Sequence, residues 1–100
     1  MRIISWNNLS AYAEEHPETK APLRRWRDLI KAADWLSMDD VRQAVPNAVV
    51  LNAQRVRFEI AGGNYRLIVM IHFRRQVVFV NFIGTHAEYD RVDALTVSQF

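Results

Sequence analysis

Residues 65–91 constrain the fold of this chain more than any other stretch, because they have the pattern of a long β-hairpin followed directly by a helix. If Arg74 and Arg75 form a two-residue turn, alternate residues of both strands fall on a common face. One face is continuously apolar and has to be buried, and it holds Tyr65, Leu67, Val69, Ile71, Phe73, Val78, Val80 and Phe82. The other face mixes polar and apolar side chains and is suited to line a cleft. The same register predicts four cross-strand pairs, which are Phe73 with Gln76, Met70 with Phe79, Ile68 with Asn81, and Arg66 with Ile83.

One end of this hairpin gathers side chains that can do chemistry. Pairing with Ile83 places Arg66 beside the start of the helix. Thr85 and Glu88 have the spacing of a capping box, which fixes where that helix begins. The first turn of such a helix presents a histidine, a tyrosine and an aspartate on one face, at i, i+3 and i+4; these are His86, Tyr89 and Asp90. We therefore predict that these three groups and Arg66 converge.

A third strand precedes the hairpin and carries positive charge. Residues 55–60 alternate between apolar and polar, and the Gly62–Gly63 pair predicts a hairpin turn that sets Ile60 against Tyr65. Arg55, Arg57 and Glu59 then share a face with Arg66. From position 55 to position 86 the chain has five arginines and one acidic residue, a balance that favours a polyanionic partner. A solvated outer face is an equally good interpretation, with Arg66 simply paired to Glu59.

The N-terminal half has the pattern of a short edge strand at residues 2–6 followed by two helices. Asn7–Asn8 offers a cap for the first helix, which Pro17 ends, and Thr19 a cap for the second. Ser37 starts a third, short helix, and residues 48–52 read as a strand or its lead-in. The second helix buries a stripe made of Leu23, Trp26, Ile30 and Ala33. The predicted fold class is α+β, with a helical hairpin on the apolar face of the sheet.

The bulk composition limits the remaining possibilities. One hundred residues make a single domain, 1–100, in which the tail 94–100 has no predicted partner and is expected to be loose. The chain has no cysteine and no apolar run of transmembrane length, which suits a cytoplasmic protein without a membrane partner. His72 and His86 do not have the spacing of metal ligands, so we predict neither a metal site nor a cofactor.

Two strings in the sequence, NYRLIVMIHF and VNFIGTHAEYDR, resemble the HigB-type toxins of bacterial toxin–antitoxin modules. The likeness extends along nearly the whole chain, and GTHAEYD is its most specific part. These toxins are similar to the RelE superfamily of ribosome-dependent mRNA endonucleases. The resemblance implies a RelE-like fold, in which helices pack on a curved antiparallel sheet and a short C-terminal helix follows. It also implies an open sheet face that accepts mRNA in the ribosome.

The resemblance also implies roles for particular residues. It assigns catalysis to Arg66, His86, Tyr89 and Asp90, without a metal. Arg55, Arg57, His72, Arg74 and Arg75 are the expected RNA-binding residues. The implied partners are the ribosome with its mRNA and a HigA-type antitoxin with a helix-turn-helix, which alone would contact operator DNA.

Two other classes of function remain open at this stage. The related ParE branch poisons gyrase, so a non-catalytic inhibitor of a protein target is one alternative. A plain RNA-binding module is the other. RNA cut only in the presence of ribosomes indicates the endonuclease, whereas blocked supercoiling without RNA cuts indicates the gyrase inhibitor.

Overall fold

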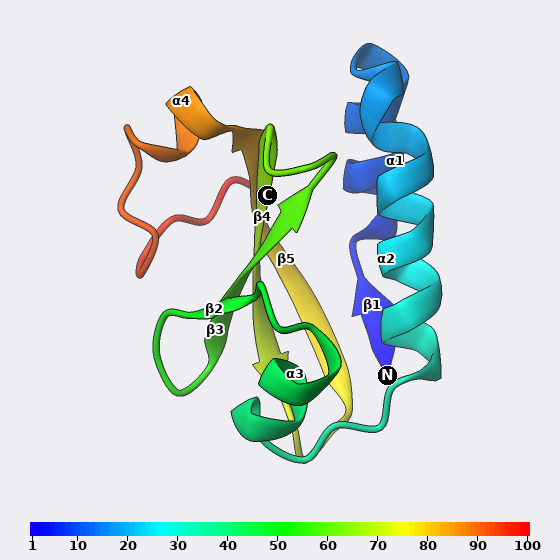
Figure 1. Cartoon of the computed structure of the whole chain (residues 1–100), viewed down its shortest axis with the longest axis vertical. Coiled ribbons are helices and arrows are strands. Elements are labelled where there is room, and N and C mark those ends of the chain that lie inside the picture. Colours follow the sequence, from blue (N-terminus) through cyan, green and yellow to red (C-terminus); the bar gives the residue numbers. More distant parts are fainter.

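A computed structural model of the chain describes all 100 residues as an α+β fold. In Figure 1 the sheet is seen nearly edge-on, with α1 and α2 on one side and α4 and the C-terminal segment on the other. In chain order the elements are β1 (Arg2–Ile4), α1 (Trp6–Glu15), η1 (Pro17–Thr19), α2 (Lys20–Ala32), α3 (Met38–Ala44), β2 (Val49–Val50), β3 (Arg55–Ile60), β4 (Tyr65–His72), β5 (Val77–Thr85) and α4 (His86–Tyr89). None of the helices combines the length and the apolarity needed to cross a bilayer.

The sheet has five strands in the order β1-β5-β4-β3-β2. The predicted antiparallel meander forms its centre, from β3 to β5. The predicted N-terminal edge strand is present as well, but it pairs in parallel with β5, with Arg2 opposite Val77. At the other edge, β2 covers only Val56 and Arg57 of β3. The sheet is therefore mixed, and half of β3 has no neighbouring strand on that side.

The predicted register between β3 and β4 is confirmed, with Ile60 opposite Tyr65 and Glu59 opposite Arg66. The β4–β5 register is confirmed only at the turn end, where Met70 lies opposite Phe79 and Val69 opposite Val80.

A β-bulge then shifts the β4–β5 register by one residue. Ile68 pairs with Phe82 and Arg66 with Gly84, so the predicted pairs Ile68–Asn81 and Arg66–Ile83 are wrong. The bulge leaves Asn81 as the extra residue, and a shift of one residue exchanges the two faces of a strand. Ile83 therefore joins the hydrophobic core, whereas Phe82, predicted to lie there, is on the opposite face with Ile68.

The C-terminal tail supplies bonds to the bulged segment. The amide of Gln99 donates to the carbonyl of Asn81 at 2.8 Å, and the side chain of Gln99 accepts from the amide of Ile83 at 2.9 Å. Arg55 adds two bonds, from its Nη1 to the carbonyls of Ala94 and Val97, at 3.1 and 2.9 Å. The tail that had no predicted partner is thus tied to β3 and β5.

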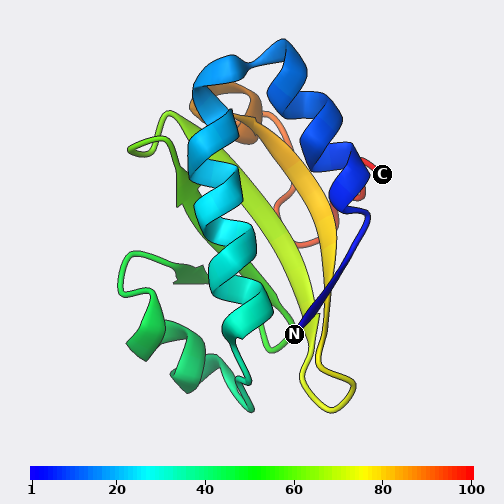
Figure 2. The same ribbon diagram turned by 90° about the vertical axis from the view of Figure 1, so that its right-hand side faces the viewer.

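The core lies between the helical layer and one face of the sheet. Figure 2 shows α1 and α2 side by side across that face. Trp26 of α2 meets Phe58 of β3 edge to face, with ring centroids 5.8 Å apart. The core is the buried side that the hairpin pattern predicted, apart from the exchange of Phe82 for Ile83, and its members from the helices and the central strands include Leu9, Ala13, Leu23, Ile30, Leu67, Val69, Ile71, Val78 and Val80.

Of the four helix caps predicted from the sequence, two are confirmed and two are wrong. Ser37 caps α3 by accepting from the amide of Asp40, and Thr85 caps α4 in a complete capping box with Glu88. Helix α1 begins earlier than predicted, at Trp6 after a left-handed Ser5, so the predicted Asn7–Asn8 cap is wrong. Thr19 precedes α2 as predicted, but its hydroxyl donates to the carbonyl of His16 at 2.7 Å and does not cap.

Replacing Val69 or Val80 with aspartate should unfold the protein. The two valines face each other in the core, 0% and 5% exposed, and a charge buried there without a partner is very costly. Circular dichroism and thermal melts measure the effect. Leu36→Asp is the matched control, because Leu36 is 77% exposed and should tolerate the charge. A Val69→Asp protein as stable as this control would contradict the assigned core.

Candidate functional site

Two arginines and a tyrosine converge on the sheet face opposite the helical layer. Arg57 comes from β3, Arg66 from β4, and Tyr89 from the last turn of α4. The guanidinium carbon of Arg66 lies 4.8 Å from the centre of the Tyr89 ring, and that of Arg57 lies 5.1 Å from it. The Nη1 of Arg57 also donates to the Tyr89 hydroxyl at 3.3 Å. Both cations thus interact with one aromatic ring, which is favourable electrostatically.

Glu59 lies between the two cations and is part of the same cluster. Its carboxylate is 3.1 Å from Nη2 of Arg57 and 3.6 Å from Nε of Arg66. The sequence predicted the pairing with Arg66 but missed the second one with Arg57. The alternation along β3 was the available signal, because it places residues 57 and 59 on one face. We call Arg57, Glu59, Arg66 and Tyr89 the arginine–tyrosine cluster.

The arginine–tyrosine cluster keeps unused hydrogen-bond donors. The side chains of Arg57, Glu59 and Arg66 are 16–18% exposed, so they are sheltered but reachable from solvent. The Nε groups of both arginines are buried and have no hydrogen-bond acceptor, so any ligand has to approach through the partly exposed remainder of these side chains. Two cations against one carboxylate also leave a net positive charge. A guanidinium with free donors is suited to a phosphate oxygen, which accepts several such bonds.

The β-bulge provides the support beneath Tyr89. It turns Phe82 toward this face, where the Phe82 and Tyr89 rings meet at 61° with centroids 6.4 Å apart. The Phe82 ring also covers Gly84, where an added Cβ would lie 2.6 Å from a ring carbon. A larger residue at position 84 therefore has to displace the Phe82 ring, which packs against Tyr89.

Gly84→Ala should disturb this support. The new methyl group must displace the Phe82 ring or shift the strand, at a cost of roughly 1–3 kcal/mol for an overpacked site. Thermal or denaturant unfolding measures the loss. Adding Phe82→Leu to the same protein removes the ring and should recover part of the stability. If Gly84→Ala alone leaves the melting temperature unchanged, the close packing of Phe82 on Gly84 is not as described.

His86 is the first residue of α4 and Asp90 is its C-cap, and both lie outside the arginine–tyrosine cluster. Nδ1 of His86 is 3.2 Å from a carboxylate oxygen of Asp90, and both side chains are more than half exposed. No hydrogen bond or ion pair joins them to Arg66. Of the four side chains predicted to converge, the structure thus brings Arg66 and Tyr89 together and sets His86 and Asp90 apart as a separate pair on the same short helix.

The other predicted RNA-binding residues lie farther away. Arg55 has its Nη1 bound to two tail carbonyls. His72, Arg74 and Arg75 lie at the β4–β5 turn, at the opposite end of β4 from Arg66. Both arginines of this turn are exposed, and Nδ1 of His72 accepts from the amide of Arg75 at 3.2 Å. No three histidine, aspartate or glutamate side chains gather to hold a metal ion.

Comparison with known proteins identifies the family of this chain. The family model of HigB_toxin, the RelE-like toxic component of a toxin–antitoxin system, matches residues 19–92. The chain belongs to the HigB toxin family. It is also 30% identical to the mRNA interferase HigB of Escherichia coli O6:H1 (strain CFT073), over 92% of this chain and 91% of that protein. The resemblance and the RelE-like fold predicted from the sequence are confirmed, and the HigB match spans every residue of the arginine–tyrosine cluster.

In this HigB-family toxin the capping box links α4, and hence Tyr89, to the sheet. The amide of Thr85 donates to the Glu88 carboxylate at 2.8 Å, and the amide of Glu88 donates to the Thr85 hydroxyl at 3.1 Å. The bond from the Thr85 amide favours the charged carboxylate and holds the pKa of Glu88 below its ordinary value of 4.5.

This lowered pKa predicts how α4 responds to acid. A group with a lowered folded-state pKa stabilises the fold above its unfolded pKa, and the contribution is lost as the pH falls through the folded-state value. We therefore expect the Thr85 amide to exchange faster with solvent as the pH drops below about 4.5. Amide hydrogen exchange by NMR, corrected for intrinsic rates, measures it. Glu88→Gln keeps an acceptor without the charge and should remove this pH dependence.

Proposed function

We propose that this chain is an mRNA interferase, a ribosome-dependent endoribonuclease that blocks translation in the cytoplasm. The observation that carries the proposal is the placement of two partly exposed cations, Arg57 and Arg66, against Tyr89. The named relative is itself an mRNA interferase, which supports the same class of reaction here. The closest alternative, a gyrase inhibitor, would not need this arrangement.

The proposed reaction is an internal displacement at phosphorus. The 2′-oxygen of a ribose attacks the adjacent phosphate and gives up its proton to a base. The bond from phosphorus to the 5′-oxygen breaks, and that oxygen takes a proton from an acid. The products are a 2′,3′-cyclic phosphate and a 5′-hydroxyl end. Negative charge builds up on the phosphate in between, so fixed cations beside it lower the barrier.

The arginine–tyrosine cluster would supply those cations. Arg66 contacts the phosphate, and Arg57 assists it from the neighbouring strand. Glu59 holds both guanidinium groups over the ring before RNA arrives, and the phosphate then competes with this carboxylate for their donors. Tyr89 positions the scissile group and can pass a proton through its hydroxyl.

We assign the remaining proton transfer to the pair on α4. Histidine exchanges protons near neutral pH, which suits it to act as acid or base. His86 takes this role, and Asp90, 3.2 Å from its Nδ1, orients the ring. RNA or ribosomal contacts beyond the cleaved phosphate fall to Arg55, His72, Arg74 and Arg75, which follow the same sheet away from α4.

The toxin–antitoxin family implies an antitoxin partner for this chain. We propose that it is a HigA-type protein with a helix-turn-helix and that operator DNA is contacted only through it. The ribosome and its bound mRNA are the proposed target. The proposed chemistry draws only on side chains of the toxin.

Single substitutions in the site should impair cleavage far more than folding. Arg66→Ala should slow cleavage by about 10²- to 10³-fold, the usual loss for one transition-state donor. His86→Ala and Tyr89→Phe should each cost roughly 10²- to 10⁴-fold if they transfer a proton. Tyr89→Phe keeps the ring under the arginines and removes only the hydroxyl. The measurement is single-turnover mRNA cleavage on programmed ribosomes at saturating toxin, with a thermal melt of each variant.

Arg74→Ala and Arg75→Ala are the matched controls for loss of charge. They should weaken ribosome binding and its salt dependence but leave the saturated rate nearly intact. Parental cleavage rates for the folded Arg66, His86 and Tyr89 variants together would overturn the site, with His72 as the next residue to test. Blocked DNA supercoiling without any RNA cut would instead favour a gyrase inhibitor.

A further inference from the structure

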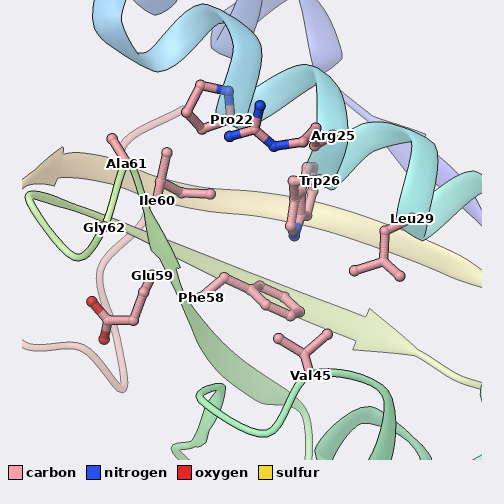
Figure 3. Close-up of a pocket in the computed structure, with 10 residues that line it drawn as sticks. All are labelled: Pro22, Arg25, Trp26, Leu29, Val45, Phe58, Glu59, Ile60, Ala61 and Gly62. Atoms are coloured by element: carbon pink, nitrogen blue, oxygen red, sulfur yellow. The ribbon is translucent and has the colours of Figure 1, made fainter.

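A groove lies between α2 and β3, around the sheet edge from the arginine–tyrosine cluster. It has a volume of about 280 Å³. Figure 3 shows Trp26 and Leu29 reaching into it from α2, with Phe58 on β3 and Val45 after α3 facing them. Arg25 lies along α2 beside Pro22, at the rim of the groove. Leu29 is 38% exposed, although its neighbours in the groove are apolar. The groove is therefore shaped to take an apolar side chain from outside.

One wall of this groove is an unpaired strand edge. The carbonyl of Arg55 accepts from the amides of Leu51 and Asn52, on the side of β3 that faces β2. Because main-chain groups of a strand alternate in direction, those of Arg57 and Glu59 point the same way. Strand β2 ends its pairing at Arg57, so the main chain of Glu59 faces no neighbouring strand. Such an edge is a template for another extended chain.

A buried donor in the groove also lacks a partner. Trp26 is 5% exposed, yet its indole Nε1 makes no hydrogen bond. In Figure 3 this nitrogen points from α2 toward β3, between Leu29 and Phe58. A buried N–H without an acceptor is costly, so an incoming acceptor that reaches it gains more than an exposed bond would give.

The rim of the groove has one free charge, which is positive. Two charged residues line the groove, Arg25 and Glu59, and Glu59 already pairs with Arg57 and Arg66. Arg25 lines the groove, is exposed and makes no ion pair. An apolar groove with this rim fits a segment that combines apolar and acidic side chains.

From these observations we propose that the antitoxin inserts an extended segment into this groove as an added strand along the free half of β3. One apolar side chain fills the space between Trp26 and Val45, and an acidic side chain pairs with Arg25. The proposal deepens the proposed function, since it rests on this chain being the toxin of a pair. Glu59 lines the groove and also binds both arginines of the cluster, so a strand docked on its main chain adjoins the site.

Charge reversal at the rim tests the surface. Arg25→Glu should weaken binding of the purified antitoxin roughly tenfold or more, measured by calorimetry, because a like charge then meets the acidic segment. Arg24→Glu is the matched control, since it makes the same change one residue away on the side of α2 that faces Lys20 and Glu14. Equal affinities for the two variants would overturn the proposal.

Hydrogen exchange of the unaltered protein tests strand addition without any variant. The Glu59 amide should exchange rapidly in the free toxin and be protected in the antitoxin complex. The outer edge of β1, the other end of the sheet, is the internal control and should not change. Failure to protect Glu59 in a verified complex would overturn the proposal, as would a toxin dimer that Arg25→Glu dissociates. The proposed function has a separate readout, because Arg25→Glu should cleave mRNA at the parental rate.

Discussion

The geometry of the molecule depends on one extra residue in β5. On the turn side of Asn81 the strand follows the simple alternation of its sequence, and beyond it the alternation is inverted. Without the bulge, Phe82 would point into the helical layer and Ile83 away from it. With the bulge, the core receives the aliphatic side chain, and the aromatic ring becomes available beneath Tyr89. A local irregularity of the ladder thus builds the support of the candidate site, as bulges next to active sites often do.

The charged side chains on that face stabilise one another. Two guanidinium groups brought together on neighbouring strands would repel if nothing lay between them. The carboxylate of Glu59 and the electron-rich face of Tyr89 offset this repulsion. The result is a sheltered surface with one excess positive charge, because two arginines share one carboxylate. This is a suitable ground state for a protein that must hold arginines in place before an anionic substrate arrives.

Local signals in the sequence predicted much of this fold. The Gly62–Gly63 turn, the capping box of Thr85 and Glu88, and the apolar alternation of β4 each depend on neighbours in the chain, and each is confirmed. The bulge was not predictable in this way, because it is held by bonds from Gln99, far along the chain. The parallel pairing of β1 with β5 is likewise non-local.

For the candidate site, the strand pattern predicted that Arg57, Glu59 and Arg66 share a face, and the helix start placed Tyr89 nearby. The pattern did not reveal that Glu59 binds both arginines, since that depends on side-chain conformation across the strands. His86 was correctly placed on α4, whereas Asp90 follows the helix as its C-cap. The i, i+4 spacing predicted that His86 and Asp90 lie close to each other, as they do. This spacing could not show that the pair is separate from Arg66.

The parallel pairing of β1 with β5 also bears on the order in which the chain folds. The face with the arginines is built from strands and a helix that follow one another between residues 55 and 89, so short loops close it. The helical face needs β1, at the start of the chain, to find β5 near its end. Contacts between residues far apart in the sequence form slowly, because the chain loses conformational entropy in closing the loop before the contact stabilises it. We therefore expect the meander to assemble first and the N-terminal strand and the two helices to close on it afterwards.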